Sequence, residues 1–347
     1  MEWFGNLFSA GQQWLFEAVV QPLMFVAGLG NLLEDGYAAT GWLLVGLLQM
    51  AVLVAVIGPL QRWRPVEAVT DRATIRTDIV YTLIHRLGLF RIALFFTVDP
   101  LFDAAFGALR AAGYGTLHLD QVWPGVTDGA VVSLLIYLVI FDFVAYWTHR
   151  AQHQSGWWWR LHSLHHAQRQ MTMWSDNRNH LLDDVLVDVI IVLVAQAIGV
   201  APGQFIAIVA LTQLSESFQH ANVRVSFGRI GERLWVSPRF HRLHHAIGIG
   251  HESPVKARKF SAGPPQGKLD PSGGSELREA SSVGATKLGG YNFGVLLPWW
   301  DVMFGTANFK PGYQPTGVRD QVETGRFYGR GLLSQQWVGL KRLLGRA

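Results

Sequence analysis

Histidines are concentrated in one stretch of the chain, and their spacing could place several of them around a metal ion. Ten of the 13 histidines lie between residues 149 and 245, and eight of these ten form three clusters. The clusters are His149-x-x-x-His153, His162-x-x-His165-His166 and His241-x-x-His244-His245. Residues three and four apart share one face of a helix, so each cluster would direct its imidazoles to one point. Neutral imidazole binds iron, zinc, copper or nickel, so the spacing predicts metal binding.

The number of histidines exceeds what a single metal ion needs. One ion takes about four to six ligands, whereas the three clusters together with His180 and His220 offer ten imidazoles. We therefore predict two metal ions. The chain contains no cysteine, so no thiolate site competes. His85, His118 and His251 stand outside the pattern, and we expect them to be ordinary surface or core residues.

Several sequence motifs resemble those of a known membrane family. The segments HRAQH, LHSLHH and FHRLHH resemble the histidine boxes of the fatty acid hydroxylase/sterol desaturase superfamily, the integral-membrane di-iron oxygenases, and the chain resembles its bacterial members. Glu216-Ser-Phe-Gln-His220 is similar to the family's Glu-x-x-x-His segment. Asn292-Phe-Gly294 and the following WDVMFGT resemble its Asn-Tyr-Gly and Trp-Asp-x-x-Phe-Gly-Thr ending. The resemblance covers roughly residues 135–306 and implies two iron ions, which zinc can replace.

Polar residues near the boxes are predicted to orient the ligands, because a metal-bound histidine usually donates its other N–H to a carboxylate or carbonyl. Asp142 lies about two helical turns before His149, and Glu216 lies one turn before His220. The complete set of candidates is Asp142, Glu216, Asn292 and Asp301. We predict no catalytic residue beyond the metal centre.

Two of the acidic positions leave alternatives open. Asp301 is expected to pair with Arg239 or Arg242. Asp183 and Asp184, which follow His180, could orient a ligand or could be charges at the N-terminus of a helix.

Composition indicates a membrane protein. Half of the residues (50%) are hydrophobic and only 16% are charged, against about 25% in typical soluble domains. The segments that approach the ~20 apolar residues of a spanning helix are about Trp14–Leu33, Gly41–Leu60, Ile79–Val98 and Ala130–Trp147. Val185–Val200 and Gln204–Phe218 flank an Ala-Pro-Gly turn and predict a helical hairpin that crosses the membrane or enters one leaflet. The alternative is a pair of helices buried in a cytoplasmic domain. The expected fold is all-α, with about four spans, this hairpin and a helical cap.

Charge predicts the orientation of the spans. Arginines 62, 64, 72 and 76 follow the second predicted span, so this loop should be cytoplasmic. The same topology brings all ten histidines to the cytoplasmic face of a membrane, which we expect to be the bacterial inner membrane. The small net charge of +4 fits cytoplasmic loops and gives no indication of nucleic-acid binding.

We predict three regions along the chain: an N-terminal transmembrane region (1–128), a catalytic domain (129–312) and a C-terminal amphipathic tail (313–347). Residues 256–288, rich in Gly, Ser, Pro and charge, are expected to form a flexible insertion in the catalytic domain. The segment Leu332–Leu344 places Leu333, Trp337, Leu340 and Leu344 on one stripe. This pattern fits a helix on the membrane surface or one packed on the catalytic domain.

The resemblance implies O2-dependent hydroxylation or desaturation of a lipid-like substrate, such as a fatty acyl chain, a sterol or a related isoprenoid. Electrons are expected from a separate ferredoxin or cytochrome with an NAD(P)H-dependent reductase, because no haem or flavin domain is recognisable. Two other functions remain as alternatives. A zinc-dependent lipid hydrolase needs only about three protein ligands, and a metal transporter or sensor should hold its ligands at mid-membrane depth.

Overall fold

The computed structural model describes residues 2–247 and 290–346, and the described chain is helical. Its β-pairing is confined to one isolated bridge between Ala246 and Thr316. The all-α prediction is therefore confirmed. His251 and the predicted insertion at 256–288 lie outside the described residues.

The first half of the chain forms a series of apolar helices. They are α1 (Glu2–Leu15), a π-helical turn (Phe16–Val20), α2 (Gln21–Val26), a 3-10 turn (Gly30–Leu32), α3 (Leu33–Val52), a second π-helical turn (Leu53–Ile57), α4 (Gly58–Trp63), α5 (Arg72–Arg86), α6 (Leu89–Thr97), α7 (Asp99–Ala111) and a 3-10 turn (Leu119–Gln121).

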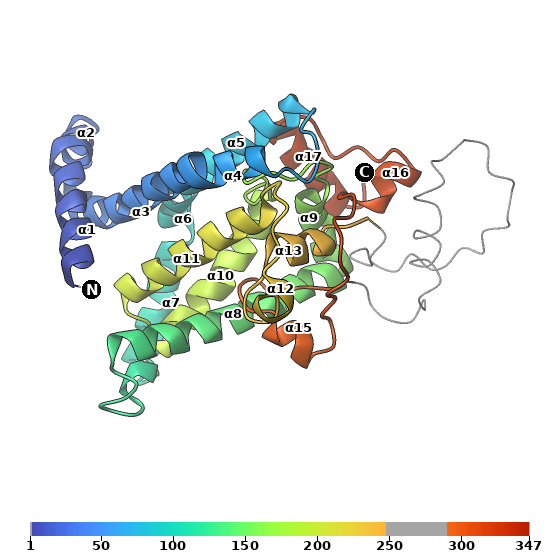
Figure 1. The fold of residues 1–347 in the computed structure, drawn as a ribbon. Helices are drawn as coiled ribbons and strands as arrows, with labels where there is room; N and C mark the ends of the chain where they lie inside the picture. Colours follow the sequence, from blue (N-terminus) through green and yellow to red (C-terminus); the bar gives the residue numbers. More distant parts are fainter. Residues whose placement is uncertain (1, 248–289, 347) are drawn as a thin grey trace, which may run out of the picture.

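The second half carries the histidines. Its helices are α8 (Ala130–Gln154), α9 (Gly156–His166), α10 (Leu181–Ile198), α11 (Pro202–His220), α12 (Gly228–Gly231), α13 (Pro238–His244), α15 (Trp299–Met303), α16 (Arg319–Glu323) and α17 (Leu332–Leu343). Figure 1 shows α3, α8, α10 and α11 extending along the molecule, with α9, α13 and α17 gathered near one end.

Two continuous helical segments of the described chain are long and apolar enough to cross a membrane. They are Gly30–Trp63, with 34 residues, and Ala130–Gln154, with 25. A third candidate is the pair α5 and α6, which passes the same test only as a broken span bent by 52°. The chain is thus an integral membrane protein with two or three candidate spans.

The other spans predicted from the sequence differ from the structure. The predicted span Trp14–Leu33 is divided among α1, a π-helical turn and α2, which ends before a turn at Gly28. The predicted span Ile79–Val98 breaks at Gly88, whose φ of 78° is left-handed. Four continuous spans are therefore not found among the described residues.

The predicted hairpin is present as α10 and α11. Gly199 ends α10 with a left-handed φ of 66°, and Pro202 occupies the first turn of α11, where its fixed φ suits a helix start. Both helices pack against α8, and α11 also packs against α3. Helix α13 packs on α11, while α9 packs on α8, α10 and α17. The hairpin therefore connects the apolar helices to the histidine-bearing end.

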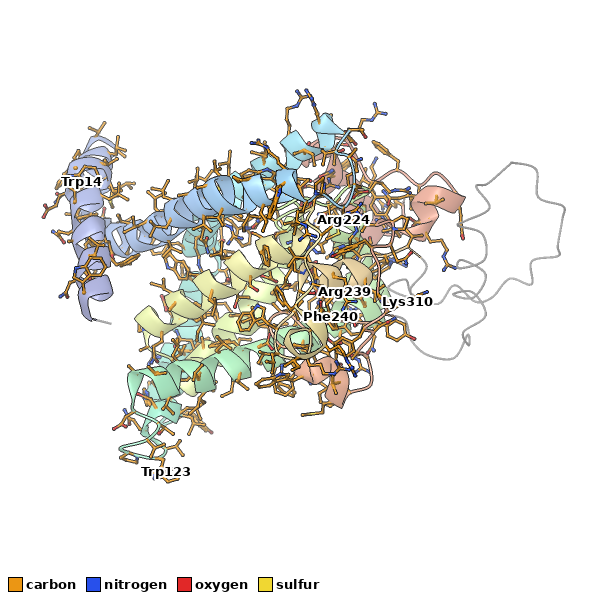
Figure 2. The ribbon with its side chains drawn as sticks, in the orientation of Figure 1. Trp14, Trp123, Arg224, Arg239, Phe240 and Lys310 are labelled. Carbon is orange, nitrogen blue, oxygen red and sulfur yellow. The ribbon has the colours of Figure 1, made fainter. Side chains whose placement is uncertain are left out.

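Basic side chains mark the histidine-bearing end of the molecule. Figure 2 shows Arg224, Arg239 and Lys310 near that end, whereas Trp14 and Trp123 lie far from it. Helix α17 buries Gln335, Gly339 and Arg342 against the protein. Leu333 and Trp337 of this helix and the adjoining Leu344 remain exposed at 81%, 58% and 59%, so the helix packs through one face and presents an apolar stripe on the other.

A close approach between α3 and α5 yields a stability prediction. Gly46 on α3 lies so close to the carbonyl oxygen of Arg86 that an added Cβ would overlap with it. We expect Gly46→Ala to lower the unfolding free energy by about 1–3 kcal/mol, because backbone must move to relieve the overlap. Thermal unfolding in detergent measures the effect.

Gly107 on α7 is the matched control for this substitution, since a Cβ there would meet nothing within 4 Å. Gly107→Ala should leave stability unchanged or raise it slightly, because alanine favours a helix. A Gly46→Ala protein as stable as wild type would contradict the contact between α3 and α5.

Candidate metal centre

Four helices deliver the histidines to one place. Helix α8 carries His149 and His153 near its C-terminal end, α9 carries the second box, α11 ends on His220, and α13 carries the third box. Helix α13 starts at Pro238, and the Ser237 hydroxyl accepts a hydrogen bond from the backbone N–H of Phe240. This N-cap fixes the direction in which the third box leaves the preceding loop.

Nine of the ten predicted histidines lie in groups whose ligand atoms are within 4.8 Å of one another. The groups are His149, His153, His162 and His166; His165, His220, His241 and His245; and His166, His244 and His245. The third group shares one residue with each of the others, so the two larger groups are adjacent. All nine side chains are buried.

In the group of His165, His220, His241 and His245, the distances between ring nitrogens match those between the ligands of one metal ion. His220 Nε2 lies 3.2 Å from His165 Nε2 and 3.1 Å from His241 Nε2, and His241 Nε2 lies 3.2 Å from His245 Nε2. Nitrogens bound tetrahedrally at about 2.0–2.1 Å lie roughly 3.3 Å from one another. The four nitrogens therefore converge at the separation of a ligand set.

Hydrogen bonds to the other ring nitrogen define the tautomers of several histidines. Nδ1 of His220 donates to Glu216 O at 2.8 Å, Nδ1 of His149 to Phe293 O at 3.0 Å, and Nδ1 of His162 to Asp183 Oδ2 at 3.0 Å. Each Nε2 then carries a lone pair, which is the form that binds metals. In the described chain, Nε2 of His149 and of His162 is buried without a hydrogen-bond partner. A buried acceptor without a partner is costly, and a metal would satisfy it.

Burial also keeps these side chains neutral. It lowers the pKa of His165, His241 and His245 well below the usual value of 6.5, and repulsion from neighbouring imidazoles lowers the pKa further. Neutral imidazole is the form in which histidine binds metals. The residues therefore fit a metal centre in both geometry and charge.

His180 is the one predicted ligand that the structure does not bring to either group. Its Nδ1 accepts a hydrogen bond from Leu182 N at 3.2 Å, and its Nε2 donates to Gln336 O at 2.9 Å. Gly339 of α17 packs directly against the His180 ring, leaving no space for a Cβ. Both ring nitrogens are therefore engaged in capping α10 and in holding α17.

His180→Ala should loosen the packing of α17 and leave the metal content unchanged, because the His180 ring contacts α17 and belongs to none of the histidine groups. We expect faster proteolysis of the C-terminal helix and a lower unfolding temperature, each compared with wild type. Metal analysis after gel filtration provides the second readout. Loss of a metal from His180→Ala with α17 still protected would instead indicate a ligand role.

Asp142 does not contact His149, the histidine that the sequence related to it. Asp142 accepts from Leu296 N at 2.7 Å, Leu297 N at 3.1 Å and Trp300 Nε1 at 2.9 Å. The carboxylate of Asp142 is buried where α8 meets the segment after Gly294, and these three donors of that segment satisfy it. Asp142 therefore anchors the loop that reaches His149, instead of reaching His149 itself.

Asp301 binds the other side of the same loop. It accepts from Phe293 N at 2.9 Å, Gly294 N at 2.7 Å and Thr306 Oγ1 at 2.6 Å. Burial raises the pKa of Asp301 to about 6. The expected pairing with Arg239 or Arg242 is wrong.

The two arginines have nearer acidic partners. Arg239 lies 3.2 Å from Glu232 and Arg242 lies 2.8 Å from Glu67, so neither is left for Asp301.

The Asn-Phe-Gly segment presents backbone carbonyls to the histidines. Asn292 has a left-handed φ of 62°, and its Nδ2 donates to Phe240 O and Asn308 O. The turn brings Phe293 O to His149, and Tyr291 O accepts from His244 Nδ1 at 2.8 Å. Asn292, Asp142 and Asp301 thus position two ligands through the main chain.

Glu216 contacts His220 through its backbone oxygen, whereas the prediction relied on its carboxylate. The nearest carboxylate is that of Asp176, whose Oδ1 lies 3.8 Å from His220 Nδ1. Asp176 is paired with Arg86 at 3.0 Å. Neither residue was singled out, although an arginine within an apolar segment is itself a functional signal.

Asp183 resolves one of the alternatives that the sequence left open. Its Oδ2 receives His162 Nδ1, and its Oδ1 accepts from Gln152 Nε2 at 2.8 Å and Trp158 Nε1 at 2.6 Å. Three donors hold this carboxylate in place, so Asp183 orients His162.

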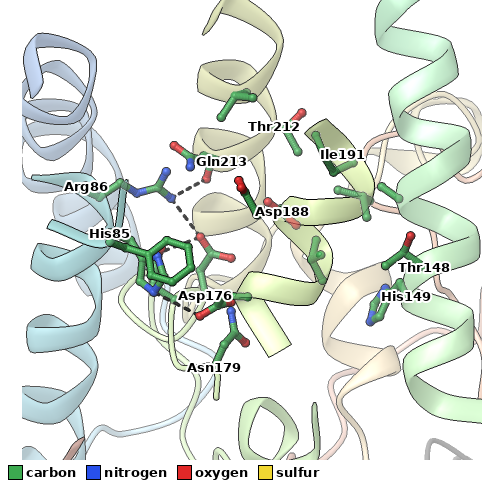
Figure 3. A pocket seen from close by; sticks show the side chains of 18 of the residues that line it. His85, Arg86, Thr148, His149, Asp176, Asn179, Asp188, Ile191, Thr212 and Gln213 are labelled. Atoms are coloured by element: carbon green, nitrogen blue, oxygen red, sulfur yellow. Dashed lines mark hydrogen bonds and ion pairs between the residues drawn. The ribbon is translucent and has the colours of Figure 1, made fainter. Parts of the chain in front are cut away.

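A cavity of about 350 Å³ adjoins the histidines. Its apolar walls come from α3, α8, α10 and α11 and include Trp42, Phe141, Ile191, Phe205 and Ile208. Figure 3 shows this pocket, with His85 and Arg86 on one side of the view and Thr148 and His149 on the other. The cavity therefore joins an apolar interior to both larger histidine groups.

A family model adds sequence similarity to this geometry. The model described as fatty acid hydroxylase matches residues 134–253, a range that contains all nine grouped histidines. This segment of the chain therefore resembles the fatty acid hydroxylase family. The resemblance of the histidine boxes is thereby confirmed.

Two curated relatives share part of the chain. The ornithine lipid hydroxylase OlsE of Rhizobium tropici is 27% identical over 195 residues, which are 56% of this chain and 57% of that protein. The alkylglycerol monooxygenase of Caenorhabditis elegans is 27% identical over 111 residues, 32% of this chain and 21% of that protein. By their names, the first relative is a hydroxylase of ornithine lipids and the second is a monooxygenase of alkylglycerols.

Two further results limit what similarity contributes. A stretch of 40 residues is 63% identical to the tryptophan synthase beta chain of a Polaromonas species, but it covers only 12% of this chain and 9% of that protein. No solved structure matches the chain. The fatty acid hydroxylase match and the histidine geometry therefore carry the functional argument.

Proposed function

We propose that this protein is a membrane-bound oxygenase of the fatty acid hydroxylase family, and that it hydroxylates or desaturates a lipid-like substrate. The observation that carries the proposal is the pair of buried histidine groups opening into one largely apolar cavity. The names of the two relatives, which are a lipid hydroxylase and an alkylglycerol monooxygenase, support a lipid substrate.

Iron is the metal that we propose for both groups. The residues that would hold it are the nine grouped histidines, with Asp183, Phe293 O, Tyr291 O and Glu216 O orienting four of them. Two bound irons supply the oxygen activation that attack on an unactivated C–H bond requires. Zinc can occupy the same imidazoles when iron is scarce.

The protein's own contribution is to align the substrate and exclude water. The cavity walls are apolar near the spans, and the histidines at its other end are buried. A lipid chain entering from the membrane would displace water from these walls, which favours binding. The buried end then confines the reacting carbon beside the histidines and protects it from solvent.

We propose that the histidine-bearing end faces the cytoplasm, where a separate ferredoxin or cytochrome and its reductase can supply electrons. The arginines after the second predicted span support this orientation. The exposed Leu333, Trp337 and Leu344 of α17 would then rest on the inner surface of the membrane. In this arrangement the N-terminal region (1–128) anchors the chain in the membrane, and the catalytic domain (129–312) carries the metal centre. The C-terminal tail (313–347) lies on the membrane surface.

A comparison of membrane lipids tests the proposal. Cells that produce the protein with adequate iron are grown under heavy-isotope O2, and their lipids are compared with those of cells that produce His220→Ala. We expect lipids that gain a labelled oxygen atom, or that lose two hydrogens, only with the wild-type protein. The purified protein should hold about two irons. Oxygen derived from water would instead identify a hydrolase.

A further inference from the structure

The pocket wall carries two ion pairs that the metal centre does not use. Asp184 of α10 lies 3.3 Å from His85 of α5, and Asp188 of α10 lies 3.0 Å from Arg91 of α6. Asp184 and Asp188 are one helical turn apart and therefore share a face of α10. All four residues line the cavity. Charged groups among apolar helices of a membrane protein generally serve a function.

The two ion pairs differ in their access to the cavity. The facing atoms of the first pair, His85 Nε2 and Asp184 Oδ2, are fully buried. The side chains of Arg91 and Asp188 are 27% and 21% exposed. The first pair therefore acts as a closed contact between α5 and α10, whereas the second can meet a ligand.

Arg91 retains donors for a ligand. Its Nη1 donates to both oxygens of Asp188, at 3.0 and 3.2 Å, and its guanidinium lies 5.0 Å from the Trp42 ring centre. Among the described residues, Nε and Nη2 of Arg91 have no protein acceptor. A guanidinium edge with two parallel N–H groups fits a carboxylate or a phosphate.

The helix sets the distance from this pair to the metal centre. Asp183, which holds His162, and Asp188 are five residues apart on α10, or about 7.5 Å along its axis. A ligand group at Arg91 and Asp188 would therefore lie in the same cavity as His149, His162 and His165, separated from them by roughly the length of a short alkyl chain.

We propose that Arg91 and Asp188 form a subsite for the zwitterionic head of an amphiphilic substrate. Arg91 binds its anionic carboxylate or phosphate, and Asp188 binds its ammonium. The substrate class follows from the proposed function and narrows it: the enzyme oxidises a zwitterionic lipid at a carbon near the head, and the apolar tail lies against walls such as Phe205 and Ile191.

Charge balance favours a zwitterion over the other head classes. An anionic head would bring its charge beside Asp188, and a cationic head would bring its charge beside Arg91. A neutral apolar ligand would desolvate the ion pair without replacing its lost hydrogen bonds, which is unfavourable. A head with both charges offers each residue a partner.

Lipids with identical tails and different heads test the subsite. We would titrate the detergent-solubilised protein, both metal-free and iron-loaded, with dihexanoyl phosphatidylethanolamine, dihexanoyl phosphatidic acid and dihexanoylglycerol, and measure affinity by calorimetry. The wild-type protein should bind the zwitterionic lipid about tenfold or more tightly than the other two. Arg91→Gln and Asp188→Asn should each remove about tenfold of that preference, as the loss of a charged hydrogen bond does.

Conservative and remote variants distinguish recognition from folding. Arg91→Lys keeps the ion pair but loses the planar guanidinium, so it should fold normally and bind the zwitterionic lipid about fivefold less tightly. Arg76→Gln removes an exposed arginine of α5 and should change neither affinity nor stability. Equal affinity of the wild-type protein for all three lipids, or variants that weaken all three equally, would overturn the subsite.

The outcome is independent of the proposed function, because binding to the metal-free protein requires neither iron nor oxygen. A protein that prefers the zwitterionic lipid but oxidises no lipid would retain the subsite and contradict the oxygenase. An active oxygenase that binds the three lipids equally would support the proposed function and contradict the subsite.

Discussion

His220→Ala is expected to abolish lipid oxidation and to reduce the bound metal from about two ions per chain to about one. His220 Nε2 lies within 3.2 Å of the Nε2 atoms of His165 and His241, so its removal opens one side of that group. The other larger group contains no residue from α11 and should keep its ion. Metal analysis of the purified protein and lipid mass spectrometry give the two readouts.

His118→Ala is the matched control, since His118 is exposed and belongs to neither group. It should leave metal content and activity at the wild-type level. An intermediate variant, Asp183→Asn, should weaken metal binding or activity about 10- to 100-fold by releasing the orientation of His162. A metal-replete, fully active His220→Ala protein would reduce the centre to the three sequence boxes.

The histidine clusters could be anticipated because their spacing is a local property. Each box lies within one helix or at its end, where residues three and four apart share a face, so the sequence alone predicts that their rings converge. His220 could be included because Glu-x-x-x-His is also a local pattern. His180 shows the limit: a histidine beside the correct boxes in sequence faces α17, and only the tertiary packing of Gly339 reveals this.

The interactions that orient the ligands could not be predicted in the same way. Phe293, Tyr291 and Glu216 accept through backbone oxygens, which every residue has, so no side-chain pattern marks them. Asp142 and Asp301 were recognised as important, but their partners include backbone N–H groups of one loop, which lies 154 residues from Asp142 and only eight from Asp301. Residue type identified these carboxylates, while their roles depend on main-chain donors that no side-chain pattern marks.

The break in the third predicted span could not be predicted for a comparable reason. Hydropathy predicts a helix through Ile79–Val98, but the segment bends at Gly88 next to Arg86. Hydropathy treats the arginine as an interruption, whereas the structure makes it the partner of Asp176 in the loop before α10 and of Gln213 and Ser217 on α11. A window average cannot register partners that lie 90 residues or more away in the chain.

Arg86→Met is expected to lower the unfolding free energy by about 3–5 kcal/mol, because it leaves a buried carboxylate without its counter-ion. The Arg86 side chain is only 1% exposed. Its Nη2 donates to Asp176 Oδ2 at 3.0 Å, Ser217 Oγ at 2.9 Å and Gln213 O at 3.0 Å. These bonds connect α5 to α11 and to the loop before α10, so their loss should lower the unfolding temperature in detergent.

The same substitution should also weaken metal retention, since Asp176 Oδ1 lies 3.8 Å from His220 Nδ1 and Arg86 fixes its position. The double variant Arg86→Met/Asp176→Asn removes both charges and should recover part of the lost stability, and the four proteins of this cycle yield the coupling energy of the pair. Arg76→Met, at an exposed position of the same helix, serves as the control. If Arg86→Met matches that control in unfolding temperature and in retained metal, the buried pair neither stabilises the helices nor supports His220. If only the double variant recovers stability while its metal is still lost, Asp176 orients His220 in its charged form.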